Sequence, residues 1–147
     1  MIVEQISVFI ENKEGRLSAI ANVLSENQID ISALSLADTE DYGVLRMIVC
    51  APHKAKKVLA ENGIIGKVTD VLAVTIEDRP GGFSKVLEVL TKEGISVNYM
   101  YASMSHQKGK ALMILSVNDV NKAEQILEVN NLSSVSPSEI YRISEKG

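Results

Sequence analysis

One pattern of residues occurs twice in the chain, and this repetition restricts the possible folds more than any other feature of the sequence. Shifting the sequence by 66 residues superimposes the two copies, and no gap is needed from residue 5 to residue 49. Two copies indicate an internal duplication, because a solenoid needs at least about three repeats. The identical residues include Glu11, Gly15, Ser18, Val23, Leu24, Ile29, Gly43, Met47 and Ile48 in the first copy, and Glu77, Gly81, Ser84, Val89, Leu90, Ile95, Gly109, Met113 and Ile114 in the second.

The first copy predicts the element order β-α-β-β-α-β. Apolar residues alternate over residues 2–10, as in a strand with one buried face, and Ile6, Val8 and Ile10 share that face. Further strands are predicted over residues 29–37, 44–50 and 65–70. Two helices are predicted, one with a stripe of Leu17, Ile20, Ala21 and Leu24, and one from Pro52 to Asn62-Gly63 with a stripe of Ala55, Val58 and Leu59.

The second copy follows with hardly a loop and repeats the same order. Strands are predicted over residues 71–76, 95–104, 111–117 and 139–143, with a hairpin turn at residues 106–109. The helix stripes are Phe83, Val86, Leu87 and Leu90, and then Ala123, Ile126 and Leu127 within residues 121–129.

This order predicts an α+β protein made of two tandem ferredoxin-like βαββαβ domains, residues 1–70 and 71–147. Each domain would have an antiparallel sheet with both helices on one face. Domains of this size are marginally stable alone, so we expect the two to pack together, either edge to edge as one eight-stranded sheet or face to face.

The strand over residues 95–104 also suggests a partner for the second sheet. Ile95, Val97, Tyr99 and Tyr101 are expected on one side, and Ser96, Asn98, Met100 and Met104 mainly on the other. Neither side is purely polar, so both are expected to contact something. Packing within the chain is one interpretation, and a homodimer is the interpretation that we favour.

Composition excludes several classes of function. The net charge of −4 and the pI near 5.2 argue against a nucleic-acid partner, which requires a basic surface. The single cysteine, Cys50, provides neither an intramolecular disulfide nor a cysteine-based zinc site. No uncharged apolar run reaches the roughly 18 residues of a membrane span. We expect a cytoplasmic protein without cofactor, metal or membrane partner.

The two copies place a glycine, Gly15 or Gly81, where a strand turns sharply into a helix. Such a turn presents free backbone N–H groups at a helix N-terminus, which suit a small anion such as a carboxylate. A free amino acid carries a carboxylate and also an ammonium group, which needs acceptors. The acceptors expected near the turns and second strands are Asn12, Asp30, Asp78 and Ser96, together with backbone carbonyls.

These features resemble the ACT domain, a small-molecule sensing module of amino-acid metabolism. The residues from Asp78 to Phe83, Asp-Arg-Pro-Gly-Gly-Phe, are similar to the family's D-x-P-G-x-L turn, and Gly94–Asn98 is similar to its G-I-N-I segment. The resemblance covers essentially the whole chain as two tandem copies. The first copy departs from the motif with Glu14 in place of proline, and Asp30 and Ser96 stand where many members carry asparagine.

The resemblance implies a ligand that lies between ACT domains, touching the turn of one and the second strand of another. The alternative is structural: the glycines serve only the turn, and Asn12 and Asp78 only cap a helix. The implied ligand-binding residues are Asn12, Lys13, Gly15, Arg16 and Leu17, with Asp30 and Ile31, in the first copy, and Asp78, Arg79, Gly81, Gly82 and Phe83, with Ser96, Val97 and Asn98, in the second.

Three functions are compatible with these residues. The favoured one is a non-catalytic sensor that binds a free amino acid and regulates amino-acid metabolism. The second is a regulatory subunit of a separate biosynthetic enzyme, for example acetolactate synthase, with weak or no ligand binding. The third is an enzyme, since acylphosphatases share the fold, but the sequence offers no convincing nucleophile, acid–base pair or metal cluster. Fold alone does not choose between them.

Overall fold

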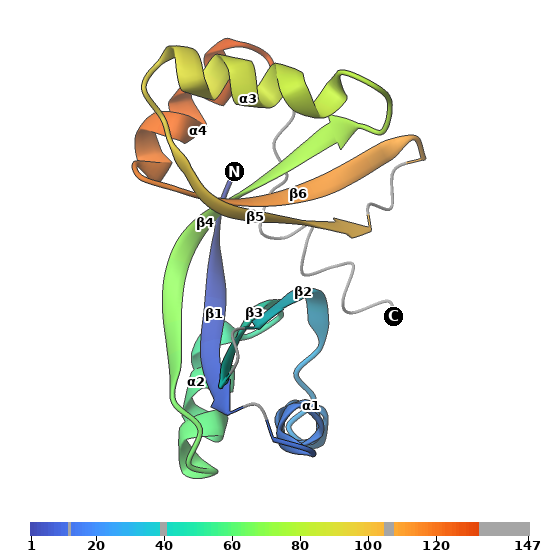
Figure 1. The fold of residues 1–147 in the computed structure, drawn as a ribbon, viewed down its shortest axis with the longest axis vertical. Helices are drawn as coiled ribbons and strands as arrows, with labels where there is room; N and C mark the ends of the chain where they lie inside the picture. Colours follow the sequence, from blue (N-terminus) through green and yellow to red (C-terminus); the bar gives the residue numbers. More distant parts are fainter. Residues whose placement is uncertain (12, 39–40, 105–107, 133–147) are drawn as a thin grey trace. The chain divides into compact units, whose positions relative to one another are not determined.

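The structure is a computed structural model, and it describes residues 1–11, 13–38, 41–104 and 108–132. Within these residues the chain divides into two compact units, one of Glu4–Thr69 and one of Met1–Val3 with residues 70–132 (Figure 1). The first three residues therefore belong to the unit that the second copy forms. No helix among the described residues is both long enough and apolar enough to span a membrane.

The unit of Glu4–Thr69 contains the elements of the first copy in the predicted order. The sheet order is β2-β3-β1-β4, and β1 and β2 each pair antiparallel with β3. The elements are β1 (Ile2–Glu11), α1 (Arg16–Glu26), β2 (Ile31–Asp38), β3 (Tyr42–Val49), α2 (Pro52–Glu61) and the beginning of β4 (Gly66–Glu77).

The core of this unit lies between the sheet and its two helices. Ile6, Val8 and Ile10 of β1 are buried together with residues of α1 and α2, which confirms the predicted strand face. The whole α2 stripe of Ala55, Val58 and Leu59 is buried as well. The predicted α1 stripe is wrong in part: Ile20 and Leu24 are buried, whereas Leu17 and Ala21 are exposed. The buried face of α1 is therefore narrower than the apolar stripe, because only one line of residues points at the sheet.

The second unit repeats this arrangement. Its sheet order is β1-β4-β6-β5, and α3 and α4 lie on the same face of the sheet (Figure 1). The core combines Leu72, Val74 and Ile76 of β4 with residues of both helices and of β6. The predicted strand over residues 139–143 and residues 106 and 107 of the predicted turn lie outside the described residues, and Lys108 and Gly109 form a turn. The elements are the rest of β4, α3 (Gly82–Lys92), β5 (Val97–Met104), β6 (Lys110–Val117) and α4 (Val120–Val129).

β4 corrects one prediction about the chain. Two strands were expected, over residues 65–70 and 71–76, but the structure has a single strand of 12 residues, Gly66–Glu77. The segment around Asp70 and Val71 contains no glycine or proline, so the extended conformation continues through it. The first residues of β4 belong to one unit and the remainder to the other.

The strand register corrects the gapless comparison of the two copies. Ile6 pairs with Met47 in the first unit, whereas Leu72 pairs with Leu115 in the second. The offset between copies is thus 66 residues in the first strand but 68 residues in the strand after the hairpin. A slip of two residues leaves every side chain on the same face, so the apolar pattern cannot reveal it. The gapless correspondence is wrong for Gly43, Met47 and Ile48 with Gly109, Met113 and Ile114.

A β-bulge corrects the predicted faces of β5. The pairing with β6 shifts between Val97 and Tyr99, so strict alternation is interrupted at Asn98. Met100 consequently packs against the same core cluster as Val97. The predicted side of Ile95, Val97, Tyr99 and Tyr101 is therefore not one continuous face.

Candidate functional site

The two strand-to-helix turns have the same backbone structure. Gly15 and Gly81 are the N-cap residues of α1 and α3, with φ of 85° and 90°. This left-handed conformation is favourable only for glycine. In the second turn the Arg79 N–H donates to the Glu77 carbonyl (2.9 Å) and the Gly82 N–H to the Arg79 carbonyl (3.1 Å). The first turn has the equivalent bonds, of 2.8 and 3.3 Å, between Lys13 and Glu11 and between Arg16 and Lys13.

The second turn is the tighter of the two. A Cβ atom on Gly82 would overlap the backbone carbonyl oxygen of Glu77, so no larger residue fits without movement of the backbone. The first copy has Arg16 at this position. Neither α1 nor α3 has a side-chain hydrogen bond at its N-cap, and the alternative role of Asp78 as a helix cap is therefore not observed.

A pocket of about 380 Å³ lies beside the second turn. This volume is within the range of about 300–1,000 Å³ that is usual for small-molecule sites. The end of β4, the turn, the first residues of α3, the start of β6 and the segment after α4 all contribute to it. The lining residues are Thr75, Ile76, Glu77, Arg79, Pro80, Gly81, Gly82, Lys85, Val86, Lys110, Asn131 and Leu132.

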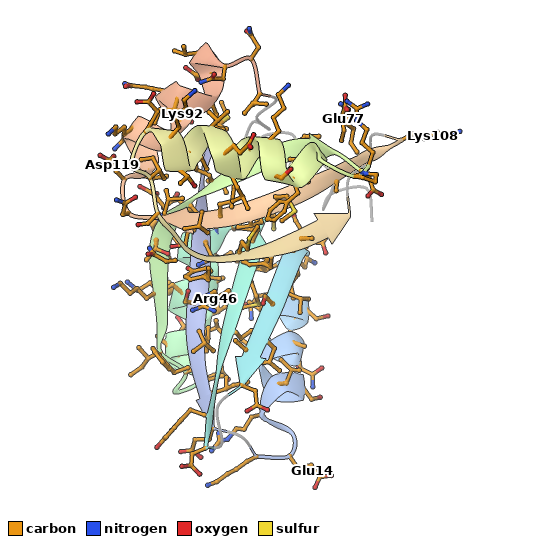
Figure 2. All side chains as sticks on the ribbon, turned by 45° about the horizontal axis from the view of Figure 1, so that its top comes forward. Glu14, Arg46, Glu77, Lys92, Lys108 and Asp119 are labelled. Atoms are coloured by element: carbon orange, nitrogen blue, oxygen red, sulfur yellow. The ribbon has the colours of Figure 1, made fainter. Side chains whose placement is uncertain are left out.

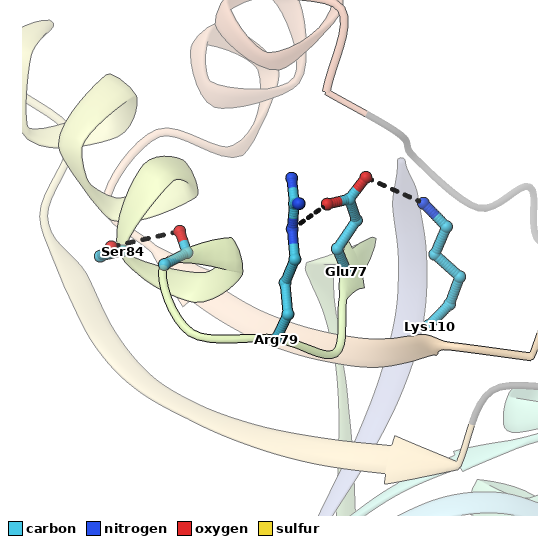
Figure 3. A network of polar contacts seen from close by, with 5 residues as sticks. Glu77, Arg79, Ser84 and Lys110 are labelled. Atoms are coloured by element: carbon cyan, nitrogen blue, oxygen red, sulfur yellow. Dashed lines mark hydrogen bonds and ion pairs between the residues drawn. The ribbon is translucent and has the colours of Figure 1, made fainter.

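This pocket carries more positive than negative charge. Glu77 is its one lining carboxylate, and it pairs with Arg79 through Nε and Oε2 and with Lys110 through Nζ and Oε1 at 3.9 Å (Figure 3). Lys85 lies one helical turn after Gly81. No carboxylate of the described residues pairs with its ammonium group. Three cationic side chains and one carboxylate thus surround the space.

The first unit has an equivalent pocket of about 390 Å³ beside its own turn. Its lining is more apolar, and Phe9 and Ile65 are 74% and 83% exposed. The carboxylate of Glu11 corresponds to that of Glu77. Hydrogen bonding to Lys13 (3.0 Å), then the charges of Lys13 and Arg16, lower the pKa of Glu11. The lining residues are Phe9, Ile10, Glu11, Arg16, Ala19, Ile20, Gly63, Ile64 and Ile65.

The turn residues predicted from the sequence divide into two groups. Arg79, Gly81 and Gly82 line the second pocket, and Arg16 lines the first. The other predicted turn residues of the described chain do not line these pockets, and Asn12 lies outside the described residues. The residues that do not line them are Lys13, Gly15, Leu17, Asp78 and Phe83.

The predicted residues of the second strands lie elsewhere. In the first unit Glu11 pairs with Tyr42, whereas Ile31 pairs with Val49 at the other end of β3. The turn and the start of the second strand are therefore at opposite ends of the same sheet. Asp30 and Ile31 line a separate shallow pocket of about 380 Å³.

In the second unit Ser96, Val97 and Asn98 lie at or just before the start of β5. The Ser96 N–H donates to Asn118 Oδ1 (3.0 Å), and the Asn118 N–H donates back to the Ser96 carbonyl (3.2 Å). The backbone of Ser96 is thus already engaged within its own unit. In neither unit do the predicted ligand-binding residues of the glycine turn lie close to those at the start of the second strand.

Sequence reasoning missed two basic residues of the second pocket, Lys85 and Lys110. Lys85 had a usable signal, since it follows Gly81 by four residues and therefore lies one turn into the helix. Lys110 had none, because only the 68-residue offset of β6 places it opposite Glu77. No cluster of three metal-ligating side chains occurs in the part of the chain that the structure describes.

Comparisons with known proteins agree with the fold. The family model described as ACT domain pair matches residues 1–144. Protein BT0572 from Bacteroides thetaiotaomicron is similar, with 34% sequence identity, a TM-score of 0.90 and 97% coverage of each chain. The ligand-free regulatory subunit of aspartate kinase from Thermus thermophilus has 15% identity and a TM-score of 0.66, over 89% of this chain and 95% of that one. No curated protein sequence matches significantly. The chain is a member of the ACT domain pair family.

Proposed function

We propose that the chain is a non-catalytic regulatory module that binds a free amino acid at its glycine turns. The observation that carries this proposal is the pair of equivalent pockets, one beside each turn, of about 380 and 390 Å³. Duplication has preserved the cavity in both copies although the surrounding side chains differ. Membership of a family of regulatory domains supports a role in regulation rather than catalysis.

The chemistry of the turns suits both ends of an amino acid. The first turn of a helix has backbone N–H groups without intrahelical partners, and the helix dipole favours an anion there by roughly 0.3–1 kcal/mol. Gly81 and Gly82 bring the backbone to the wall of the second pocket. A carboxylate at the same wall, Glu77 or Glu11, is an acceptor for the ammonium group of the ligand.

The predicted ligand-binding residues at the start of the second strand of each unit remain part of the proposal if the ligand lies between two different ACT domains. Asp30 and Ser96 lie at the end of their own sheet that is far from the turn, as the strand register requires. They reach a ligand at a turn only when that turn belongs to a different ACT domain. Binding of the ligand would then favour one arrangement of domains over another, which is the basis of allosteric regulation.

A thermal-shift screen of the twenty L-amino acids, with D-enantiomers as controls, tests this function. A ligand that binds only the folded state adds about 2.7 kcal/mol of stability at a hundredfold excess over Kd. We expect one or a few L-amino acids to raise the melting temperature, and Arg79→Ala to reduce that shift. No shift with any amino acid at millimolar concentration would contradict the proposal.

A regulatory subunit that docks on a separate enzyme is the second candidate. Leu34 and Leu36 of β2 are 55% and 46% exposed, and β2 is an edge strand of its unit among the strands that the structure describes. Exposed leucines on an edge strand are typical of a surface that another chain covers. A second copy of this chain is the first partner to test, by sedimentation of the wild type and of Leu34→Lys. A metabolic enzyme is the partner to seek if the wild type sediments as a monomer.

A further inference from the structure

The two pockets occupy equivalent places but differ in charge. Across the sheet, Lys110 lies opposite Glu77 in the second unit, and Tyr42 lies opposite Glu11 in the first. The helix position that lines the pocket is Lys85 in α3 and Ala19 in α1. The helix position is therefore uncharged in the first pocket and cationic in the second, and Lys110 lines the second pocket whereas Tyr42 does not line the first.

The positive charge of the second pocket exceeds what a neutral amino acid requires. A zwitterionic ligand brings one carboxylate and one ammonium group, which the turn and Glu77 already match. Arg79 and Lys110 share the single carboxylate of Glu77, and Lys85 has no carboxylate partner among the described residues. These three cations and one carboxylate leave two excess positive charges, and a ligand with a second carboxylate would offset one of them.

We infer that the second pocket selects an acidic L-amino acid, aspartate or glutamate. In this arrangement the α-carboxylate lies at the Gly81 amide, since the Gly82 N–H already donates to the Arg79 carbonyl, and the ammonium group lies at Glu77. The side-chain carboxylate pairs with Lys85 and Lys110. The inference rests on the proposed function, because it assigns a ligand class to one of the two turns.

The carboxylate of Glu77 favours an amino acid over a simple dianion. A dicarboxylate without an ammonium group, or inorganic phosphate, would meet the same cations but would also be repelled by Glu77, which lines the same space. The first pocket lacks the two lysines, and Phe9 and Ile65 make its rim apolar. The first pocket therefore serves as an internal comparison for the second, because the two have similar volumes but different charges.

Isothermal titration calorimetry on the full chain tests the inference with aspartate, glutamate, asparagine, glutamine, succinate and phosphate. Each acid and its amide have nearly the same shape, so their difference isolates the side-chain charge. We expect the better acid to bind at least about tenfold more tightly than its amide, since hydrogen bonds between charged groups are the stronger ones. The preference should weaken at higher salt concentration.

Matched variants locate the site. Lys85→Ala should reduce the preference for the acid over its amide, because only Lys110 then remains to pair with the side-chain carboxylate. Lys92→Ala removes the same charge from the last turn of the same helix, outside this pocket, and should keep the preference. Figure 2 shows Lys92 at the end of α3 that is far from Glu77. Circular dichroism and the melting temperature establish whether both variants are folded. If Lys85→Ala does not fold, Lys85→Gln replaces it.

Each outcome of these titrations has a distinct meaning. Binding of neutral amino acids with no preference for acids would overturn the inference and leave the proposed function intact. An absence of binding to any amino acid would overturn both. Succinate or phosphate binding as tightly as the acids would overturn the assignment to an amino acid. A preference that is undiminished in Lys85→Ala and Lys85→Gln would overturn the location.

Discussion

Lys110 lies directly opposite Glu77 in the β4–β6 pair, and its Nζ atom is 3.9 Å from Glu77 Oε1. The equivalent pair in the first unit is Tyr42 with Glu11. This difference in one cross-strand partner, together with Lys85, changes the charge of one pocket relative to the other. Two copies of one fold thereby obtain cavities of similar size and different chemistry.

Gly82→Ala should destabilise the second unit. The new Cβ would overlap the Glu77 carbonyl oxygen, and because that atom belongs to the backbone, relief requires the turn to move. We expect a loss of about 1–3 kcal/mol in the free energy of unfolding, measured with urea. A loss below about 0.5 kcal/mol would show that the turn relaxes to the form that accommodates Arg16 in the first copy.

Two leucines of α1 should respond very differently to truncation. Leu24 is 1% exposed in the core, and Leu17 is 43% exposed on the same helix. Leu24→Ala should cost about 2–5 kcal/mol of unfolding free energy, because it removes buried methyl groups and leaves a cavity. Leu17→Ala should change stability by about 0.5 kcal/mol or less. Equal losses in both variants would contradict the observed packing of α1.

Glu77→Gln should affect ligand binding more than stability. The Glu77 carboxyl is about half exposed, and its ion pairs with Arg79 and Lys110 lie at the surface. Pairs of this kind contribute roughly 0–1 kcal/mol, so the melting temperature should change little. Calorimetric affinity for the amino acid should fall, because the ammonium group loses its charged acceptor. A large loss of stability with unchanged affinity would assign Glu77 a structural role instead.

The Glu11 carboxyl should titrate below its usual range in the folded protein. The hydrogen bond from Lys13 and the charges of Lys13 and Arg16 lower its pKa. A lowered carboxyl pKa adds stability above the unfolded pKa, and this contribution is lost as pH falls through the folded pKa. Side-chain NMR titration should show the Glu11 pKa rising in Lys13→Ala. An unchanged pKa in that variant would mean that the contact does not persist in solution.

Much of the fold follows from local sequence patterns. The 66-residue repeat predicts the duplication, and the apolar periodicity predicts the helices and strands of the described residues in their correct order, except that it divides β4 into two strands. Pro52 and Asn62-Gly63 mark the bounds of α2 because proline and glycine act on the backbone locally. The glycine turns at Gly15 and Gly81 follow for the same reason, since their positive φ is a local requirement.

The relations between strands had to come from the tertiary structure. A slip of two residues keeps each side chain on its face, so the pattern alone could not place β6, and Lys110 was not recognised as the partner of Glu77. The bulge in β5 and the continuity of β4 also depend on pairing with neighbouring strands rather than on local preference. The sequence by itself thus determined which elements form and where the backbone turns, because these depend on neighbours along the chain. Only the tertiary structure decided which charged side chains share a pocket, because that depends on register between segments far apart in sequence.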